Sequence, residues 1–353
     1  MSQVSEEAQA RWKAEWDAHE QELVQNFYSI KVPRVAGRRV CTPRDCDAFA
    51  RRLLNTTSED IRRVDNQGSS SYTLICDSQS KIIQFRIKPF DPRTMQTAHQ
   101  IYGDISPEVD HYSNFALPVY VSKVLPGKVH VLRGFRARDN FPLEREKRTV
   151  TDLAEVIAKS AHYPRSADAY TDTSWTKSAK STLTFLMEYK WFQSIAPEVV
   201  EKIRSVYTQL DLLNQLPAVL THHDLTQLNI FVNEAGAVTG IVDFDKAEYE
   251  ALGMCIFGLY ECFVGSMENR IFSFHNFPAK DGSGKTVRQV LESAFWDTFW
   301  AKLPAGLERK KLEAPMRVAI DVGIINRYFH PSFVNTTGER ALSYADGILL
   351  GRE

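Results

Sequence analysis

The sequence lacks the features of a membrane or secreted protein. No apolar run in its 353 residues is long enough to span a bilayer. The N-terminal stretch MSQVSEEAQARWKAEW is polar and acidic, without the basic and then apolar pattern of a signal peptide. The five cysteines have no regular spacing, which is typical of a reduced intracellular protein. These absences predict a cytoplasmic protein that acts without a membrane partner.

The sequence also lacks an excess of either charge. Its 43 basic residues nearly balance its 44 acidic ones, so no overall field favours nucleic acid as a partner. Apolar residues make up 43% of the chain, including 20 Phe, 13 Tyr and 6 Trp, which is enough for a large core. The length fits two or three domains, or one two-lobed enzyme. Cys41 and Cys46 do not form a C-x-x-C pair, so we expect buried or idle thiols.

The most informative stretch lies between residues 220 and 247. His222, Asp224 and Asn229 are spaced H-x-D-x-x-x-x-N. Two β-branched apolar runs follow, IFV and VTGIVDF, joined by Asn-Glu-Ala-Gly. This pattern predicts a loop and a tight hairpin whose second strand ends at Asp243. The alternative is a hydrated hairpin in which the polar residues only cap and turn the chain.

The polar groups of this stretch suit phosphoryl transfer from a magnesium nucleotide. One aspartate accepts or orients the attacking hydroxyl, while an asparagine and a second aspartate hold hard cations through oxygen. The motif H-x-D-L-x-x-x-N, followed by an apolar strand ending in Asp-aromatic, resembles the catalytic core of the aminoglycoside phosphotransferase and choline kinase group. The segments FWDTFW and LSYADGILLG resemble the fungal-type branch of that group.

The resemblance covers roughly residues 60 to 350 and implies an α+β, two-lobed, protein-kinase-like fold. It implies a small antiparallel β-sheet in the N-lobe and a mainly helical C-lobe. We expect an N-terminal helical extension at 1–58, an N-lobe with the nucleotide-binding sheet and hinge at 59–126, and a C-lobe at 127–353 containing the catalytic loop. Apolar spacing over residues 5–28 and the Thr-Pro start at 42–43 predict the two helices of the extension.

The N-lobe pattern predicts three antiparallel strands within residues 61–90. Gly68 and Ser69 lie in the NQGSSS turn, where a kinase-like fold places the loop that covers the phosphates.

On the third strand the resemblance implies a cation for the α- and β-phosphates, and Arg86 is the best candidate. A solvated strand face is the alternative. A kinase would add a helix glutamate to pair with this cation, but residues 92–103 contain none, and Gln96 is the nearest polar candidate.

The stretch LPVYVSKVLPG, at residues 117–127, resembles the hinge between the two lobes. The resemblance implies that backbone groups of Ser122, Lys123 and Val124 bind the adenine of the nucleotide.

The DGSGKT stretch looks like the end of a phosphate-binding P-loop, but Ala279 stands where that motif needs its first glycine. We therefore expect an exposed loop there.

The resemblance assigns a role to each residue of the catalytic stretch. Asp224 is the catalytic aspartate that takes or aligns the acceptor proton. His222 holds the loop by hydrogen bonds, with a role as catalytic base as the alternative. Asn229 and Asp243 bind Mg²⁺ at the phosphates of ATP. Lying between His222 and Asp224, His223 occupies a variable position and receives no role.

The predicted function is ATP-dependent transfer of the γ-phosphate to a hydroxyl of a small molecule, with secondary metabolism or resistance as the suggested setting. The missing helix glutamate motivates an alternative, a kinase-fold pseudoenzyme or binding protein without phosphoryl transfer. The acceptor pocket is expected between the loop at 162–175 and the C-terminal helices, where Asp168, Asp172 and Asp297 are available to bind a cationic substrate.

Overall fold

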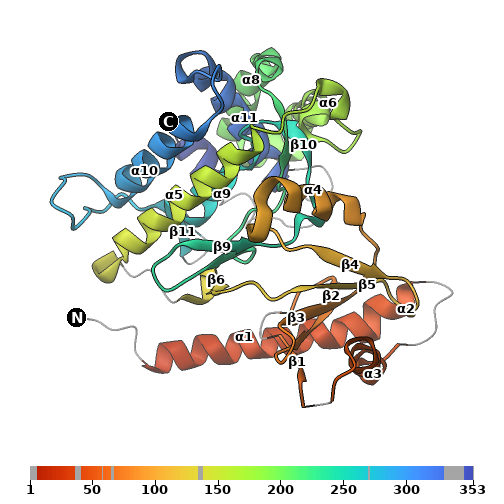
Figure 1. The fold of residues 1–353 in the computed structure, drawn as a ribbon. Helices are drawn as coiled ribbons and strands as arrows, with labels where there is room; N and C mark the ends of the chain where they lie inside the picture. The colour runs from red at the N-terminus through yellow and green to blue at the C-terminus, as the bar shows by residue number, and fades with distance from the viewer. Residues whose placement is uncertain are drawn as a thin grey trace. The chain divides into compact units, whose positions relative to one another are not determined.

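The computed structural model describes residues 6–35, 41–57, 59–64, 67–133, 138–268, 271–329 and 346–352. The chain divides into two compact units, which are described separately (Figure 1). Unit 1 comprises Met1–His99 and Ser106–Leu125, and unit 2 comprises Gln100–Ile105 and Pro126–Glu353. Among the described helices, none combines the length and the apolar character needed to cross a membrane.

Unit 1 contains a five-stranded antiparallel sheet in the order β1-β2-β3-β5-β4. The three strands predicted within residues 61–90 are confirmed as β1 (Ile61–Arg63), β2 (Ser71–Cys76) and β3 (Lys81–Arg86). β5 (Val119–Lys123) corresponds to the predicted hinge strand. β4 (Val109–Tyr112) was not predicted, because its sequence VDHY lacks the apolar alternation of a half-buried strand.

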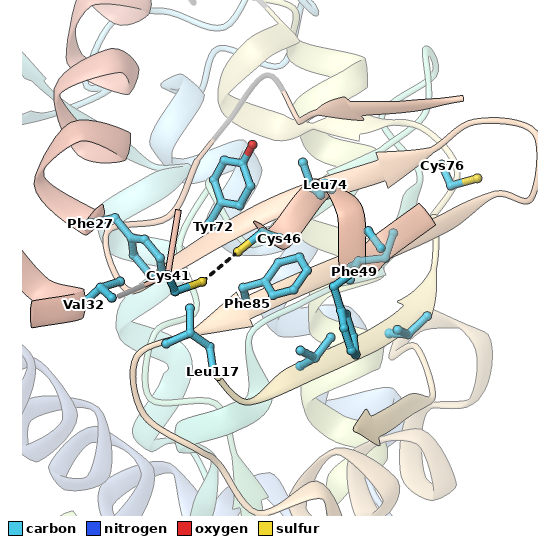
Figure 2. Close-up of a cluster of buried hydrophobic side chains, with 14 residues drawn as sticks. Phe27, Val32, Cys41, Cys46, Phe49, Tyr72, Leu74, Cys76, Phe85 and Leu117 are labelled. Atoms are coloured by element: carbon cyan, nitrogen blue, oxygen red, sulfur yellow. Dashed lines mark hydrogen bonds between the residues drawn. The ribbon is translucent and has the colours of Figure 1, made fainter. Parts of the chain in front are cut away.

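Helices cover this sheet and supply its core. α1 (Glu6–Asn26) continues into the π-helical turn η1 (Phe27–Lys31) and α2 (Val32–Arg34), while α3 (Pro43–Leu54) follows a Thr42 capping box. Phe27, Phe49 and Phe85 lie in one buried cluster (Figure 2). The ring centroids of Phe49 and Phe85 are 6.2 Å apart, in the edge-to-face geometry that aromatic pairs favour. α4 (Pro92–Tyr102) follows β3 in the chain.

Two of the cysteines meet within this cluster. The sulfur atoms of Cys41 and Cys46 are 3.6 Å apart, and both residues are buried (Figure 2). They flank Thr42, the N-cap of α3, at positions where apolar side chains commonly pack across the start of a helix. The two thiols therefore help to fix the beginning of α3, which agrees with the prediction of buried thiols.

Unit 2 is mainly helical. Its longest helices are α5 (Leu143–Ser160), α6 (Trp175–Glu188), α8 (Pro197–Tyr207), α10 (Val287–Lys302) and α11 (Arg309–Phe329), and the shorter ones are α7 (Lys190–Ile195) and α9 (Phe257–Cys262). α5 and α10 lie side by side (Figure 1). Most of these helices coincide with apolar periodicity in the sequence.

The described part of unit 2 also contains three small antiparallel sheets. The first joins β6 (Lys128–Val129), β8 (Ile230–Val232) and β9 (Val238–Ile241), and the second joins β7 (Ala218–Thr221) and β10 (Glu248–Ala251). The third joins β11 (Gly265–Glu268) and β12 (Ile271–Phe274). The DGSGKT stretch forms an exposed turn before α10, as predicted.

One helix prediction in unit 2 was wrong. The apolar run at 252–265 predicts a single helix, but the chain forms the 3₁₀ turn η8 (Met254–Ile256), the short α9 and then β11. Periodicity alone cannot distinguish a buried strand from a buried helix in such a run. The sequence also predicts a last helix near residues 341–350. Residues 341–345 lie outside the described residues, and Asp346–Leu350 form the π-helical turn η9.

Two glycines allow the helices that surround the catalytic stretch to approach closely. A Cβ atom on Gly258 of α9 would overlap the carbonyl oxygen of Leu225. A Cβ atom on Gly323 of α11 would overlap the carbonyl oxygen of Met254, just before α9. The absence of a side chain at these positions lets α9 pack directly on the catalytic stretch and α11 on the turn before α9.

The aromatic core of unit 1 can be tested by mutation. Phe85 is fully buried between Phe49, Tyr72 and Phe115. Replacing it with alanine removes these contacts and leaves a cavity, so Phe85→Ala should lower the free energy of unfolding by about 3–5 kcal/mol. Chemical denaturation followed by circular dichroism measures the change. Phe185→Ala, at a surface position, is the matched control, and equal losses in both variants would contradict the assignment of this core.

Candidate active site

The hairpin predicted after the H-x-D motif is confirmed. β8 and β9 pair in antiparallel register, with Ile230 opposite Ile241. Their turn closes as the side chain of Asn233 accepts a hydrogen bond of 3.0 Å from the Ala237 N–H, and Gly236 adopts a φ of +84°. α5 holds the outer end of the hairpin, because the Thr149 hydroxyl donates to the Gly236 carbonyl at 2.7 Å.

His222 links the catalytic loop to the end of the hairpin. Its Nδ1 accepts a hydrogen bond from the backbone N–H of Asp224 at 3.0 Å, so Nε2 carries the proton and donates to the Val242 carbonyl at 2.8 Å. Burial lowers the pKa of His222, which keeps the imidazole neutral in this role. The ring thus ties the backbone at Asp224 to the residue that precedes Asp243, a geometry that suits a structural role.

Asp243 lies two residues beyond the end of the second strand, in an uncommon backbone conformation. Its φ of 68° and ψ of 39° lie in the left-handed region, which aspartate tolerates better than most residues. The next residue, Phe244, is buried, and its ring lies 4.7 Å from that of His222 and 5.3 Å from that of Tyr102. Tyr102 in turn donates to the Leu220 carbonyl at 3.2 Å. The aromatic anchor at Phe244 fixes the turn that carries Asp243.

Asn229 lies beside both elements. Its side-chain amide donates to the Asp224 carbonyl at 2.7 Å, and its own carbonyl accepts from the Val242 N–H at 3.0 Å. Because Nδ2 is the donor in the first contact, the side-chain oxygen of Asn229 is left to act as a ligand or acceptor. Asn229 and Asp243 therefore stand at the same end of the hairpin, next to the loop that carries Asp224.

A buried carboxylate that the sequence did not single out supports the other side of the loop. Glu250 of β10 is fully buried and accepts a 2.9 Å hydrogen bond from His223. It also accepts bonds from the first turn of α6, through the N–H groups of Trp175 and Thr176 at 2.6 and 2.7 Å. The ring of Trp175 stacks on that of His223 at 4.0 Å. His223, which received no role from the sequence, thus joins the catalytic loop to α6.

Asp224 itself is paired with a cation from a distant helix. Nη2 of Arg327, on α11, lies 2.8 Å from Oδ1 of Asp224. Arg327 also approaches Glu261 of α9 at 3.6 Å, and Tyr328 donates to that same carboxylate at 2.6 Å. Sequence reasoning missed Arg327 because a single arginine near the end of a long helix gives no local signal of its partner.

The nucleotide-side residues predicted in unit 1 form no single cluster among the described contacts. Gly68 and Ser69 lie in the exposed turn before β2, where Lys31 donates to the Ser69 carbonyl. The partly buried Arg86 ends β3, with its guanidinium 5.0 Å from the centre of the Phe90 ring. Gln96, considered as its partner, is exposed on α4.

The predicted hinge residues belong to β5 and its continuation. Ser122 pairs with Ile82 on one side and with Val109 on the other, so its backbone lies within the sheet. Lys123 is exposed at the end of β5. The Val124 N–H donates to the Ser80 carbonyl at 2.9 Å, which leaves the carbonyl of Val124, and not its N–H, for an adenine.

The three acids considered for the acceptor pocket are not brought together. Asp172 is largely exposed and pairs with Lys177 at 2.7 Å. Asp168 accepts a hydrogen bond from the hydroxyl of Ser166. Asp297, on α10, lines a separate cavity of about 630 Å³ between α8, α10 and α11.

Comparisons with solved structures show the fold. The ethanolamine kinase of Plasmodium vivax is 12% identical, with a TM-score of 0.53 over 95% of this chain and 94% of its own. APH(2″)-IIa, solved in a ternary complex with streptomycin and ATP, is 12% identical, with a TM-score of 0.50 over 88% and 99%. A macrolide 2′-phosphotransferase type I is 11% identical, with a TM-score of 0.50 over 88% and 98%. The fold is therefore the two-lobed, α+β, protein-kinase-like class predicted from the sequence.

Comparison with models of protein families identifies one family that part of the chain resembles. Residues 98–252, which contain the whole catalytic stretch, match the phosphotransferase enzyme family known as APH. The predicted resemblance to the aminoglycoside phosphotransferase and choline kinase group is thereby confirmed, whereas the fungal-type branch stays a prediction. No curated protein matches the chain in sequence.

The bridging role of His222 predicts a pH-dependent contribution to stability. His222→Ala should lower the free energy of unfolding by about 1–3 kcal/mol at neutral pH, because two backbone groups lose their partner. The unfolded imidazole takes up a proton near pH 6.5, whereas the buried one does so only at lower pH. The stability that His222 contributes is therefore lost as the pH falls below about 6.5, and the gap between wild type and variant should narrow.

Urea denaturation at several pH values measures this gap. His19→Ala, at an exposed position, is the control and should change neither the stability nor its pH dependence. A gap that widens toward acid pH would show that His222 is charged in the folded protein.

Glu250 should be one of the least replaceable side chains of unit 2. Glu250→Ala leaves the N–H groups of α6 and the His223 ring without their buried acceptor, and should cost about 3–5 kcal/mol of unfolding free energy. Glu250→Gln keeps part of the network and should cost less. Glu248→Ala removes only hydrogen bonds to exposed threonines and should cost about 1 kcal/mol or less. Thermal and chemical denaturation rank the three variants, and an equal loss in Glu248→Ala would contradict the special role of Glu250.

Proposed function

We propose that the protein is an ATP-dependent phosphotransferase that transfers the γ-phosphate to a hydroxyl of a small molecule. The observation that carries the proposal is the placement of Asp224, Asn229 and Asp243 around one end of the β8–β9 hairpin, joined through His222. The match of this segment to a family of phosphotransferase enzymes supports the same reaction. Similar folds include an ethanolamine kinase and a macrolide 2′-phosphotransferase, whose acceptors are small molecules.

Asp224 is the group that meets the acceptor. Its carboxylate is one-third exposed, and Oδ2 has no hydrogen-bond partner among the described residues. Oδ2 accepts the hydrogen bond of the acceptor hydroxyl and aligns its oxygen for attack on the γ-phosphorus. The new P–O bond forms as the bond to the β,γ-bridging oxygen breaks, and ADP leaves with the electron pair. The hydroxyl proton passes to Asp224 or to the transferred phosphoryl group.

Asn229 and Asp243 fit the requirements of a magnesium site. Each offers a side-chain oxygen, which suits a hard cation, and both stand at the same end of the hairpin. Mg²⁺ is commonly held by one or two protein oxygens, with phosphates and water completing its shell. Bound there, the ion would neutralise charge on the nucleotide phosphates.

On the nucleotide side, Arg86 is the proposed cation for the phosphates, and Gly68 and Ser69 the proposed covering turn. The fixed fork of donors on an arginine suits a phosphate without a helix glutamate to orient it. The stacking of Phe90 against Tyr120 at 3.8 Å, and of the Arg86 guanidinium over Phe90, orients this side chain instead. A pseudoenzyme remains the competing function, favoured only by the missing glutamate.

The decisive variant for this function is Asp224→Asn, which keeps the shape of the side chain. Its turnover of Mg-ATP should fall by about 10²–10⁴-fold with nucleotide binding preserved, because the carboxylate that aligns the acceptor is lost. ADP release measures the rate, and mass spectrometry should find an acceptor heavier by about 80 Da, the mass of one transferred phosphoryl group. Asp211→Asn, at an exposed position of unit 2, is the control. Unchanged turnover in Asp224→Asn would contradict the proposed function.

A further inference from the structure

Asp224 does not stand free in its loop, because one of its two carboxylate oxygens is already bound. Oδ1 lies 2.8 Å from Nη2 of Arg327, and the two side chains are 34% and 27% exposed. Among the described residues, no hydrogen bond to Oδ2 of Asp224 is found. The ion pair with Arg327 therefore holds Oδ1 of Asp224, while Oδ2 is open to another molecule.

Arg327 is itself fixed by groups on α9 and α11. Its Nε lies 3.6 Å from the Glu261 carboxylate, and its guanidinium lies 5.7 Å from the centre of the Phe257 ring. Tyr328 holds Glu261 from the other side with a hydrogen bond of 2.6 Å. Burial by itself would lower the pKa of Arg327, but Glu261 and Asp224 raise it, so the guanidinium stays charged. A charged side chain held at several points has little freedom to move away from Asp224.

The loop that carries Asp224 is in direct contact with α9, the helix that carries Glu261, a partner of Arg327. Gly258 of α9 packs against the Leu225 carbonyl, next to Asp224 in the chain. The side chain of Gln227 donates to the Cys262 carbonyl at 2.6 Å and so fastens the loop to the end of α9. Because Arg327 approaches Glu261 of α9, these contacts hold the loop and the guanidinium of Arg327 against the same helix, as is required of groups that position a reacting atom.

The neighbouring acids are engaged as well. Within the described part of unit 2, the acidic side chains of β10 and of the loop before α6 accept hydrogen bonds or ion pairs from the chain's own donors. These acids are Glu248, Glu250, Asp168 and Asp172. A cationic acceptor at Asp224 would have to compete with Arg327 for the carboxylate, whereas a neutral hydroxyl needs only the open Oδ2.

We infer that Arg327 is a positioning residue that holds Oδ1 of Asp224, and that it directs the site toward neutral, hydroxyl-bearing acceptors and away from cationic ones. The inference rests on the proposed function and names the acceptor class of the same site. Because Arg327 keeps one oxygen occupied, the acceptor hydroxyl meets Asp224 in a single orientation. Its contribution lies in the alignment of the acceptor and not in binding of the nucleotide.

Kinetics of Arg327 variants test the positioning role. Arg327→Gln should lower kcat for Mg-ATP turnover with inositol or glycerol as acceptor by about 10–100-fold, with little change in KM for Mg-ATP. Arg327→Lys, which restores the charge, should recover a substantial part of kcat. Arg317→Gln, at an exposed position of the same helix, is the matched control and should behave like wild type. Failure of lysine to recover more activity than glutamine, at equal Tm, would overturn the positioning role.

Binding measurements test the acceptor class independently of turnover. Calorimetric titration with streptomycin and with ethanolamine should show weak binding to wild type and at least ten-fold tighter binding to Arg327→Gln, because Asp224 and Glu261 are then released to bind a cation. Cationic binding that is equal in the two proteins, or tight in wild type, would overturn the inference. If wild type instead releases no ADP with any acceptor, the proposed function fails, while the titration still decides whether Arg327 excludes cations.

Discussion

The candidate active site depends on one neutral, buried imidazole. By accepting from the Asp224 N–H and donating to the Val242 carbonyl, His222 joins two segments that the hairpin alone would leave independent. The geometry requires the uncharged ring, because a protonated Nδ1 could not accept the first bond. Burial against Phe244, which lowers the pKa of His222, keeps the ring in that form. The chemistry proposed for Asp224 and Asp243 thus depends on a histidine that need take no part in it.

Around this link, unit 2 surrounds the candidate catalytic loop with charged groups, some buried and some half-buried, that bind one another. On one side Glu250 binds His223 and the first turn of α6, and on the other Arg327 binds Asp224 and Glu261. Buried charges are costly unless they are paired and hydrogen-bonded, so these networks specify one arrangement of the loop. Close packing at Gly258 and Gly323 fixes the same arrangement through backbone contact. The loop is positioned by its surroundings more than by its own sequence.

This explains how far the sequence could predict the site. Asp224, Asn229 and Asp243 could be proposed from the sequence because they lie on one loop and hairpin, where local spacing determines their geometry. The fold class followed from the same motif and from the strand pattern of unit 1. Glu250 and Arg327 were missed because their partners are set by tertiary packing, and nothing near them in the chain shows which carboxylate or cation they meet. The apolar run before β11 was misassigned because burial on all sides erases the periodicity that separates strand from helix.

The central claim is that the chain transfers a phosphoryl group to another molecule, with Asp224 aligning the acceptor. The most direct measurement incubates wild type and Asp224→Asn with Mg-ATP labelled in its γ-phosphate and a mixture of small hydroxyl compounds, and then separates the labelled products. Wild type should form a labelled organic phosphate, and the yield should be lower by about 10²–10⁴-fold with the variant. Label found only in ATP and inorganic phosphate, or an organic phosphate formed equally by both proteins, would contradict the proposed activity.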